Sequence, residues 1–399
     1  FKNLELKNVN LLKLRGSYGQ TGTESGVNRF GYLSTYSLVE NAICIGGNLY
    51  SGFNEGALVS PELLSWYTRD SYNYGLDYAF FQHRLKGSVD YFFYITKGGL
   101  MSPADRYITP LGTALPQIKS DSEHRREGFE VSARWSDQVG HDFNYDVGTN
   151  MTYYNNLYVK NVSESLSALM NPYQRNTHQT DYYGLLLVDN GLYQSVDQVL
   201  GSPRRPESTE TKLGDIVYQD INGDGKVNSE DKVRYGMPTS PHFTYGVDFL
   251  LSYKGFSLSG LFYGTGKRHM MFGIAARSAD TQNIKNAYQL DYWRPDNTDA
   301  LFPRISTTSR VNGENNYIES SFYLKNASFL RLKNLTLAYD FKYKLLKNVK
   351  WLTTCRVNLT GSNLFTISGV SDYFDPETTN TNGGYPVSRV YSFGVTVGF

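Results

Sequence analysis

Cysteine, net charge and long apolar runs are all scarce in this sequence, and each scarcity excludes a class of protein. Cys44 and Cys355 are the only two cysteines among 399 residues, too few for a disulfide framework or a zinc cluster. The net charge of +1 gives no indication of nucleic-acid binding. No apolar run approaches the roughly 18 residues that a transmembrane helix needs. The first residues, FKNLELKNVNLLKLRG, do not have the pattern of a signal peptide.

Two classes remain open: a soluble all-β protein and a membrane β-barrel, in which only alternate residues face lipid. The sequence contains 33 Tyr, 22 Phe and 37 Gly, far more aromatic residues than an ordinary globular chain. In the final stretch VYSFGVTVGF, aromatic and aliphatic residues from Tyr391 to Phe399 alternate with small or polar ones. This period of two predicts a strand with one apolar face. Ten such segments recur, at 12–18, 72–80, 85–95, 129–135, 143–151, 242–253, 256–264, 331–341, 355–363 and 390–399.

The connections between these segments are alternately short and long. The short ones lie near 81–84, 137–141, 254–255 and 342–350, and the long ones near 21–65, 100–125, 157–240, 267–321 and 364–386. A soluble β-sandwich, the alternative in which the aromatics form a core, has no reason to keep its long loops at one end. An outer-membrane barrel does, because its short turns face the periplasm and its long loops face outside. The pattern favours an all-β, transmembrane antiparallel up-and-down β-barrel.

The two faces of the predicted strands fit such a barrel. Polar residues on the inward face would line a wet lumen, and outward Tyr and Phe would lie against outer-membrane lipid and form aromatic girdles. The alternation changes phase between Leu332 and Leu335, which predicts a bulge or a strand that leaves the apolar zone. The inward polar residues are Asp90, Arg134, Asp146, Asp248 and Arg356.

Several stretches resemble, in order and over essentially the whole chain, the SusC/RagA-type TonB-dependent outer-membrane transporters. They include LLKLRGSYGQTG (11–22), REGFEVSARW (126–135), GDIVYQDINGDGKVNSEDKVRYG (214–236), YWRPDN (292–297) and VNLTGSNLFT (357–366). The resemblance implies a barrel of about 22 strands with an N-terminal plug domain in its lumen. We therefore expect residues 1–399 to form the C-terminal portion of such a barrel, with about ten strands and no plug domain. A smaller barrel complete in itself is the alternative.

The resemblance also implies a function and a location. A multi-pass protein of the bacterial outer membrane would import an oligosaccharide or peptide ligand, with a SusD-like surface lipoprotein as its lid. The TonB complex would supply energy through a segment outside this chain. Three alternatives stay open: a passive porin or adhesin, a SusC-like barrel with a structural role in an outer-membrane assembly, and a soluble calcium-binding β-protein. No nucleic-acid partner is expected.

The stretch DINGDGKVNSED (220–231) has the spacing of a twelve-residue calcium loop. Gly225 lies at the sharp turn, and the twelfth residue is Asp rather than Glu, which shortens its reach. A bound calcium ion would have a structural role and would order the long loop 157–240. The alternative is a polar turn without a metal. The candidate ligands are Asp220, Asn222, Asp224, the Lys226 carbonyl, Asn228 and Asp231.

Catalytic signals are poor, so we expect no enzyme and no redox or nucleotide cofactor. The six histidines are scattered, and neither HExxH nor GxSxG occurs. GTGKR (264–268) lacks the first Gly and the Ser/Thr of a phosphate loop. Loop aromatics are able to stack on sugars or peptide side chains, although loop packing or girdle anchoring is the favoured role for any single one. The substrate-binding candidates are Tyr182, Tyr183, Tyr292 and Trp293, with Tyr173, Tyr193, Tyr317 and Tyr373 as further loop aromatics.

Overall fold

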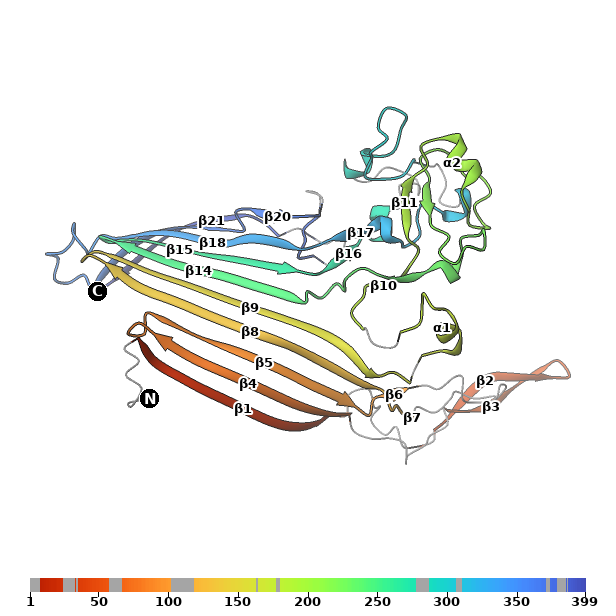
Figure 1. Ribbon diagram of the computed structural model, residues 1–399, viewed down its shortest axis with the longest axis horizontal. Coiled ribbons are helices and arrows are strands. Elements are labelled where there is room, and N and C mark those ends of the chain that lie inside the picture. Colours follow the sequence, from red (N-terminus) through yellow and green to blue (C-terminus); the bar gives the residue numbers. More distant parts are fainter. Residues whose placement is uncertain are drawn as a thin grey trace.

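The fold is dominated by one large, curved β-sheet with a body of folded loops at one end (Figure 1). The computed structural model describes residues 8–23, 33, 35–56, 67–101, 118–162, 164–176, 180–277, 287–305, 311–370, 374–378, 385 and 387–399.

The main sheet is antiparallel, and its strands follow one another in chain order. Each of the ten predicted segments corresponds to one of its ten long strands, so the predicted up-and-down topology is confirmed. A short eleventh strand, β20 (Thr366–Ser368), pairs with β18. The ten are β1 (Val9–Thr23), β4 (Tyr67–Phe80), β5 (Leu85–Lys97), β8 (Glu123–Val139), β9 (Phe143–Lys160), β14 (Phe243–Tyr253), β15 (Phe256–Gly266), β18 (Phe329–Asp340), β19 (Thr354–Ser362) and β21 (Val390–Gly398).

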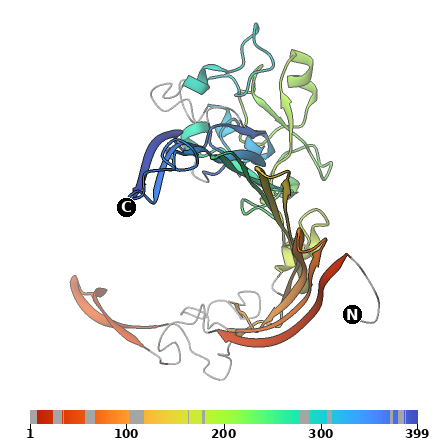
Figure 2. The same ribbon diagram turned by 90° about the vertical axis from the view of Figure 1, so that its left-hand side faces the viewer.

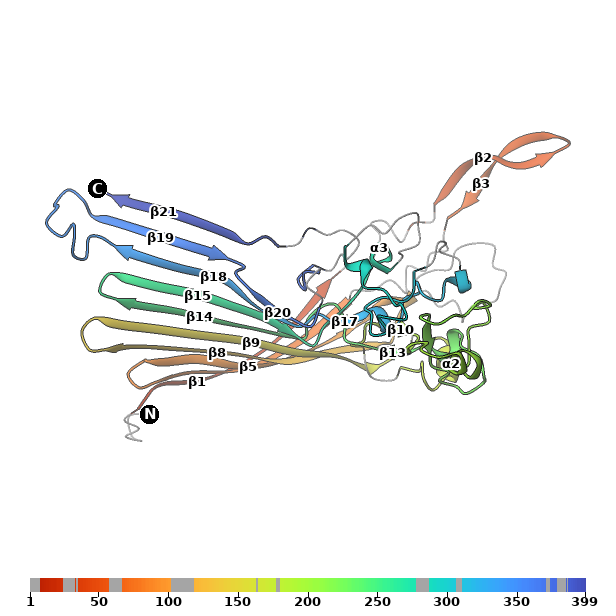
Figure 3. The ribbon, with the colours of Figure 1, turned by 90° about the horizontal axis from the view of Figure 1, so that it is seen from above.

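Short turns join the strands at one end of the sheet, and the long loops leave from the other (Figures 1 and 3). This alternation is the one predicted from the loop lengths. The third long loop begins after Lys160 and not at residue 157, because β9 stays paired with β8 as far as the Glu123–Lys160 pair. Lys333 has no partner on β15, where the register shifts between Leu261 and Phe262, and this is the bulge that the phase change predicted.

The outward face carries the predicted apolar band and aromatic girdles. Tyr18, Tyr72 and Phe93 form a run of rings near the loop end, with centroids 5.0 and 4.6 Å apart. Near the short turns, the rings of Trp351 and Phe399 stack at 5.7 Å. Apolar residues between the two girdles are uncovered; Leu14 is 83% exposed and Leu359 55%. An apolar face of this kind is stable only against lipid or another apolar surface.

The main sheet is an open arc and not a closed barrel (Figure 2). Within the described residues, β1 pairs only with β4 and β21 pairs only with β19. Both outer strands therefore present a row of unpaired main-chain N–H and C=O groups. No helix among the described residues is long and apolar enough to cross a membrane.

The long loops contain secondary structure that the sequence analysis did not predict. The hairpin of β2 (Tyr36–Ile45) and β3 (Asn48–Glu55) projects away from the sheet (Figure 3). The other elements are β6 (Leu100–Met101), β7 (Ile118–Lys119), α1 (Leu166–Met170), β10 (Gly184–Leu186), β11 (Asp189–Leu192), α2 (Val196–Gly201), β12 (Ile216–Tyr218), η3 (Ser229–Asp231), β13 (Val233–Tyr235), β16 (His269–Met271), α3 (Ile274–Arg277), η4 (Ala287–Leu290), η5 (Val311–Glu314), η6 (Ser321–Tyr323) and β17 (Leu324–Asn326).

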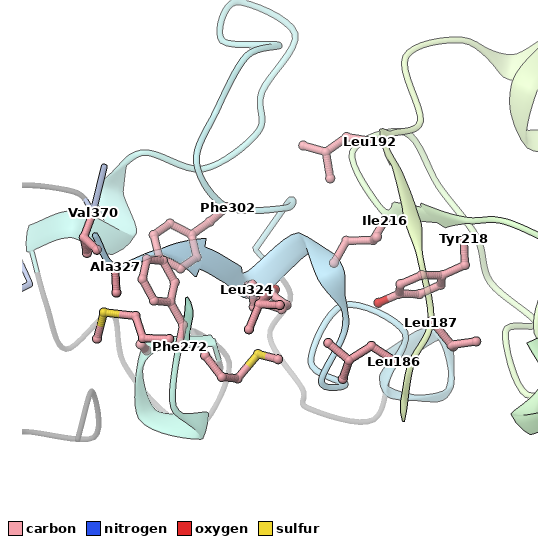
Figure 4. Close-up of a cluster of buried hydrophobic side chains, with 14 of the residues drawn as sticks. Leu186, Leu187, Leu192, Ile216, Tyr218, Phe272, Phe302, Leu324, Ala327 and Val370 are labelled. Atoms are coloured by element: carbon pink, nitrogen blue, oxygen red, sulfur yellow. The ribbon is translucent and has the colours of Figure 1, made fainter. Parts of the chain in front are cut away.

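The described residues of two long loops, 161–242 and 267–328, fold together into what we call the loop body. Its core holds the most completely buried large apolar side chains of the described residues, including Ile216, Phe272 and Tyr323, each at most 1% exposed. Figure 4 shows residues of both loops, with Val370 from the loop after β19, in one apolar cluster. The burial of these large apolar side chains stabilises a fixed structure outside the membrane sheet.

Candidate functional site

The inward face of the sheet carries a network of arginines and carboxylates near the short-turn end. Arg15 on β1 donates to Asp77 on β4 at 2.9 Å and to Asp90 on β5 at 3.0 Å, so one guanidinium joins three strands. Gly75 lies beneath this group, because a Cβ there would meet the Asp90 carboxylate at 2.5 Å and the Arg15 guanidinium at 2.7 Å. The missing side chain of Gly75 therefore makes room for the bridge.

A second bridge has the same construction further along the sheet. Arg134 on β8 pairs with Asp146 on β9 and donates to Asp248 on β14 at 2.7 Å. Gly148 lies beneath it, and a Cβ there would be 2.6 Å from both Arg134 and Asp248. These residues confirm the predicted polar, inward face. Arg356 of the predicted set donates to Ser257 at 2.8 Å.

The inward face changes in character where the strands approach the long loops. The Arg69 guanidinium lies over the Tyr94 ring, 4.5 Å from its centroid. The Arg126 guanidinium lies 5.8 Å from the same ring and 4.8 Å from the ring of Tyr154. The Tyr154 ring is in turn 4.8 Å from that of His242. We call Arg69, Tyr94, Arg126 and Tyr154, from the four strands β4, β5, β8 and β9, the mouth ladder.

An ionic anchor fixes the mouth ladder to the loop body. Asp181 accepts hydrogen bonds from the Asn156 side chain at 2.7 Å and from the Asn156 main chain, and it lies 3.3 Å from His242 Nε2. Burial opposes the ionisation of Asp181, but the bonds from His242 and Asn156 outweigh it and hold its pKa below the ordinary value. Asn156 also accepts from Arg126 Nε, so the ladder and the loop share one network.

A polar hub lies inside the loop body. The carboxylate of Asp215, completely buried, accepts from Asn312 Nδ2 at 2.9 Å and from Asn316 Nδ2 at 2.8 Å, and it pairs with Arg304. The Lys212 main-chain N–H adds a further donor at 2.9 Å. Asp215 belongs to one long loop and its three side-chain partners to the other, so the hub locks the two loops together.

The predicted calcium loop is an ordered turn whose carboxylates bind its own main chain. Asp220 accepts from the N–H groups of Gly223 and Gly225, both at 2.7 Å, and Asp224 accepts from Lys226 N–H at 2.8 Å. Asn222 Oδ1 accepts from Asp224 N–H at 3.0 Å. Each of these acceptor oxygens keeps a second lone pair that points away from its donor.

Asp231 and Asn228 hold the end of the same turn. The buried carboxylate of Asp231 accepts from the N–H groups of Ile221, Asn222 and Asn228, at 2.9, 3.2 and 2.8 Å. Asn228 Oδ1 accepts from Glu230 N–H at 2.6 Å. No group of three or more His, Cys, Asp or Glu side chains converges on one point among the described residues. A cation here would therefore depend on amide and main-chain oxygens as well as on carboxylates.

The predicted substrate-binding aromatics lie on the loop body. Tyr183, Tyr292 and Trp293 pack against its apolar core, and Trp293 Nε1 donates to Gln194 at 3.0 Å. Arg234 lies over the ring of Tyr182, 5.3 Å from its centroid. Contact between these four side chains and a ligand stays a prediction.

The further loop aromatics have separate positions. Tyr193 and Tyr317 are buried, 2% and 7% exposed, which is the packing role weighed for them, and Tyr173 is exposed at 45%. Tyr373 lies outside the described residues. The mouth ladder was not among the predicted sites. Arg69, Arg126 and Tyr154 lie just beyond segments with clear alternation, and Tyr94 lies near the end of the segment 85–95.

Comparisons with known proteins agree on one kind of relative, although no family model matches the chain. TonB-dependent receptor P3 of Formosa agariphila is 27% identical over 97% of this chain and 39% of its own length. TonB-dependent receptor SusC of Bacteroides thetaiotaomicron is 26% identical over 97% of this chain and 38% of its own length. The RagAB peptide importer in an open-open state superposes with a TM-score of 0.72 at 20% identity, over 100% of this chain and 41% of the other. The chain thus spans about two fifths of the length of these proteins.

Proposed function

We propose that this chain, which is part of a SusC/RagA-type TonB-dependent receptor of the outer membrane, forms one wall of an importer for a peptide or an oligosaccharide. The observation that carries the proposal is the open ten-stranded arc with an apolar outer face and an ionic inner face. Receptors of this type are transporters, in agreement with the expectation of a non-enzymatic protein.

The open edges argue for a wide lumen. Unpaired main-chain groups inside lipid cost several kcal/mol each, so β1 and β21 need strand partners in the membrane. Ten strands closed on each other would give a narrow barrel largely filled by its own side chains. The arc does not bring β1 and β21 together (Figure 2). Pairing with further strands of a longer receptor would give a lumen wide enough for an oligomeric ligand. The open edges therefore favour such a receptor over a small passive porin.

The loop body supports a role in capturing and covering the ligand. It is rigid, because an apolar core and the Asp215 hub hold it together, and it stands at the mouth of the wall (Figure 1). We propose that it supports a SusD-like surface lipoprotein as a lid, and that the TonB complex drives release of the ligand. The solved relative is named a peptide importer, which favours a peptide for this chain over an oligosaccharide.

Uptake by whole cells tests the proposal. Cells with the complete receptor gene should accumulate a labelled peptide or oligosaccharide mixture, and deletion of the gene should abolish the uptake. Dissipating the proton gradient with a protonophore should abolish it as well. Uptake that persists at the original rate without the gradient would identify a passive channel and overturn the proposal. A receptor that co-purifies with assembly proteins and gives no uptake would indicate the structural role.

We also propose that Ca²⁺ binds the turn 220–231. Asp220, Asn222 and Asp224, with the Lys226 carbonyl and Asn228, would provide oxygen ligands, the donor type that Ca²⁺ requires. Support comes from the turn itself, in which main-chain N–H groups already hold Asp220 and Asp224. Three of the four lone-pair directions of Asp231 are used by main-chain donors. Asp231 would therefore contribute one bond to the cation and not two.

A further inference from the structure

The arginines of the inward face differ in whether a carboxylate lies beside them. Near the short turns, Arg15 and Arg134 each bridge two carboxylates. At the loop end, Arg331 is bound to both Asp375 and Glu377. Among the described residues, no carboxylate lies within ion-pair distance of Arg69 or Arg126. Within that part of the chain, these two guanidinium groups therefore carry their positive charge without a carboxylate partner, at the entrance of a ligand passage.

We propose that Arg69 and Arg126, held on the Tyr94 ring, form a luminal subsite for the carboxylates of an acidic peptide. The inference rests on the proposed import function and names its ligand class. A guanidinium that lies over an aromatic ring keeps its N–H edge free for a carboxylate, and the planar fork matches the two carboxylate oxygens.

The donors of the subsite are prepared for a ligand. Among the described residues, Arg126 makes one side-chain hydrogen bond, from Nε to Asn156, which leaves the donors of its two terminal nitrogens for a ligand. The exposed side chain of Arg69 makes no hydrogen bond to any described residue, and the Tyr94 ring alone positions it. The contacts to Tyr94 and Tyr154 fix the direction of the guanidinium groups before a ligand arrives, which lowers the entropy cost of binding.

The strand beneath explains how the rings meet. Gly128 on β8 lies between the aromatics of its two neighbours, since a Cβ there would be 2.8 Å from the Phe92 ring and 2.9 Å from the Tyr154 Cβ. Phe92 stacks with Tyr94 at 6.3 Å. The glycine thus allows β5 and β9 to bring their aromatic side chains together across β8. A larger residue would separate the rings and with them the two arginines.

The same geometry favours a peptide over a sugar acid. A sugar ring binds to an aromatic side chain by stacking on an open ring face. The guanidinium groups of Arg69 and Arg126 lie over Tyr94, and Tyr154 lies between Arg126 and His242. What the subsite presents is N–H donors and not an open aromatic platform. Carboxylates on flexible Asp or Glu side chains, or at a peptide C-terminus, are able to reach these donors without stacking.

Binding of defined probes to the full-length receptor, purified in detergent, tests the proposal. The probes are N-acetyl hexaglutamate, the hexaglutamine of equal length, and trigalacturonate. Wild-type receptor should bind hexaglutamate tighter than hexaglutamine, and added salt should reduce the difference. The Arg69→Gln/Arg126→Gln double variant should bind hexaglutamate about tenfold more weakly or worse, as expected for lost charge-assisted hydrogen bonds. The double variant should bind hexaglutamine with the same affinity as the wild type does.

Two further variants make the result specific. Arg84→Gln removes an arginine near the short turns, where it pairs with Asp137 at 2.9 Å, and should leave all probe affinities unchanged. Arg69→Gln alone disturbs no hydrogen bond to a described residue and should weaken hexaglutamate binding by a smaller factor, which keeps the test valid if the double variant fails to fold. The proposal is overturned if wild type binds hexaglutamate and hexaglutamine equally well. It is also overturned if hexaglutamate affinity is unchanged in both Arg69→Gln and the Arg69→Gln/Arg126→Gln double variant.

The remaining outcomes separate the inference from the import function. If trigalacturonate binds as tightly as hexaglutamate and loses affinity in the same variants, the subsite is one for acidic sugars, and the peptide assignment is wrong. These binding experiments need no TonB complex and no proton gradient. If cells show energy-dependent uptake but their purified receptor shows no arginine-dependent binding, the subsite is wrong and the import function is retained. If the receptor shows arginine-dependent binding but gives no energy-dependent uptake, the import function is wrong and the subsite is retained.

Discussion

The Cα of Gly148 on β9 faces the guanidinium of Arg134 on β8 so closely that a Cβ would lie 2.6 Å from Arg134 Nη2. The same Cβ would lie 2.6 Å from Asp248 Oδ1. A side chain here therefore has to displace an ion pair that joins three strands.

Gly148→Ala is expected to destabilise the wall, because overpacking of this kind costs roughly 1–3 kcal/mol. The displaced Arg134 would also leave Asp248 without its partner. The measurement is the temperature at which the purified receptor loses its folded mobility on a gel. Gly19→Ala is the matched control, since no described atom lies within 4 Å of the Cβ that it adds. An equal effect of the two substitutions would contradict the role given to Gly148.

How far the sequence predicts this structure depends on how local each signal is. The alternation at 143–151 is a local pattern, so the first half of β9 was predictable. The rest of β9, up to Lys160, lacks clear alternation and is a strand because β8 pairs with it. The contact between Arg134 and Asp248 joins residues 114 positions apart. Only the register of three strands brings these two side chains together.

The loop body was not predictable for a related reason. Its core takes short apolar stretches from separate loops, such as Leu186 and Leu187 from one loop and Met270 to Phe272 from another. None of these stretches is long enough to show a period. The turn at 220–231 was recognised because its oxygens follow one another in the chain. The mouth ladder was missed because its arginines come from strands on either side of the tyrosine that they share.

The hub at Asp215 should control the stability of the loop body. Asp215→Asn places an amide where all the surrounding groups are donors, and it leaves Arg304 without a counter-ion. Removing one partner of a buried pair costs about 3–5 kcal/mol. Amide hydrogen exchange should report this as faster exchange at the Ile216 N–H, which Asn316 holds in the wild type. Asp197→Asn, at an exposed position in α2, should leave the exchange unchanged. Slow exchange in the Asp215 variant would show that the apolar core alone holds the two loops together.

Acid should loosen the contact between His269 and Met237. Nδ1 of His269 accepts a hydrogen bond from the Met237 N–H at 2.9 Å, and burial lowers the pKa of His269 below its ordinary value of 6.5. As the pH falls, His269 therefore takes up a proton at a lower pH in the folded state than in the unfolded state. Stability is unaffected well above pH 6.5 and falls as the pH drops from there toward the folded pKa.

The exchange rate of the Met237 amide, compared between neutral and mildly acidic pH, tests this expectation. After correction for intrinsic exchange, protection should fall with acid in the wild type. His269→Asn keeps an acceptor that does not titrate, and its protection should depend less on pH. Protection with the same pH dependence in both proteins would show that His269 is not the titrating group.

Calcium removal should open the turn 220–231 to protease. Lys226 is exposed within it, so trypsin cleavage after Lys226 reports directly on the order of the turn. Excess EGTA should accelerate this cut in the purified receptor, and added Ca²⁺ should slow it.

Asp224→Asn keeps the size of the side chain and its capacity to accept from Lys226 N–H, but removes one charge from the proposed site. Because affinity for Ca²⁺ depends on the charge of the ligand set, the midpoint of protection should move to a Ca²⁺ concentration on the order of tenfold higher. Asp197→Asn removes an equal charge elsewhere on the loop body and should leave the midpoint in place. Cleavage that is indifferent to both EGTA and Ca²⁺ would mean that the main-chain hydrogen bonds of Asp220, Asp224 and Asp231 hold the turn without a metal.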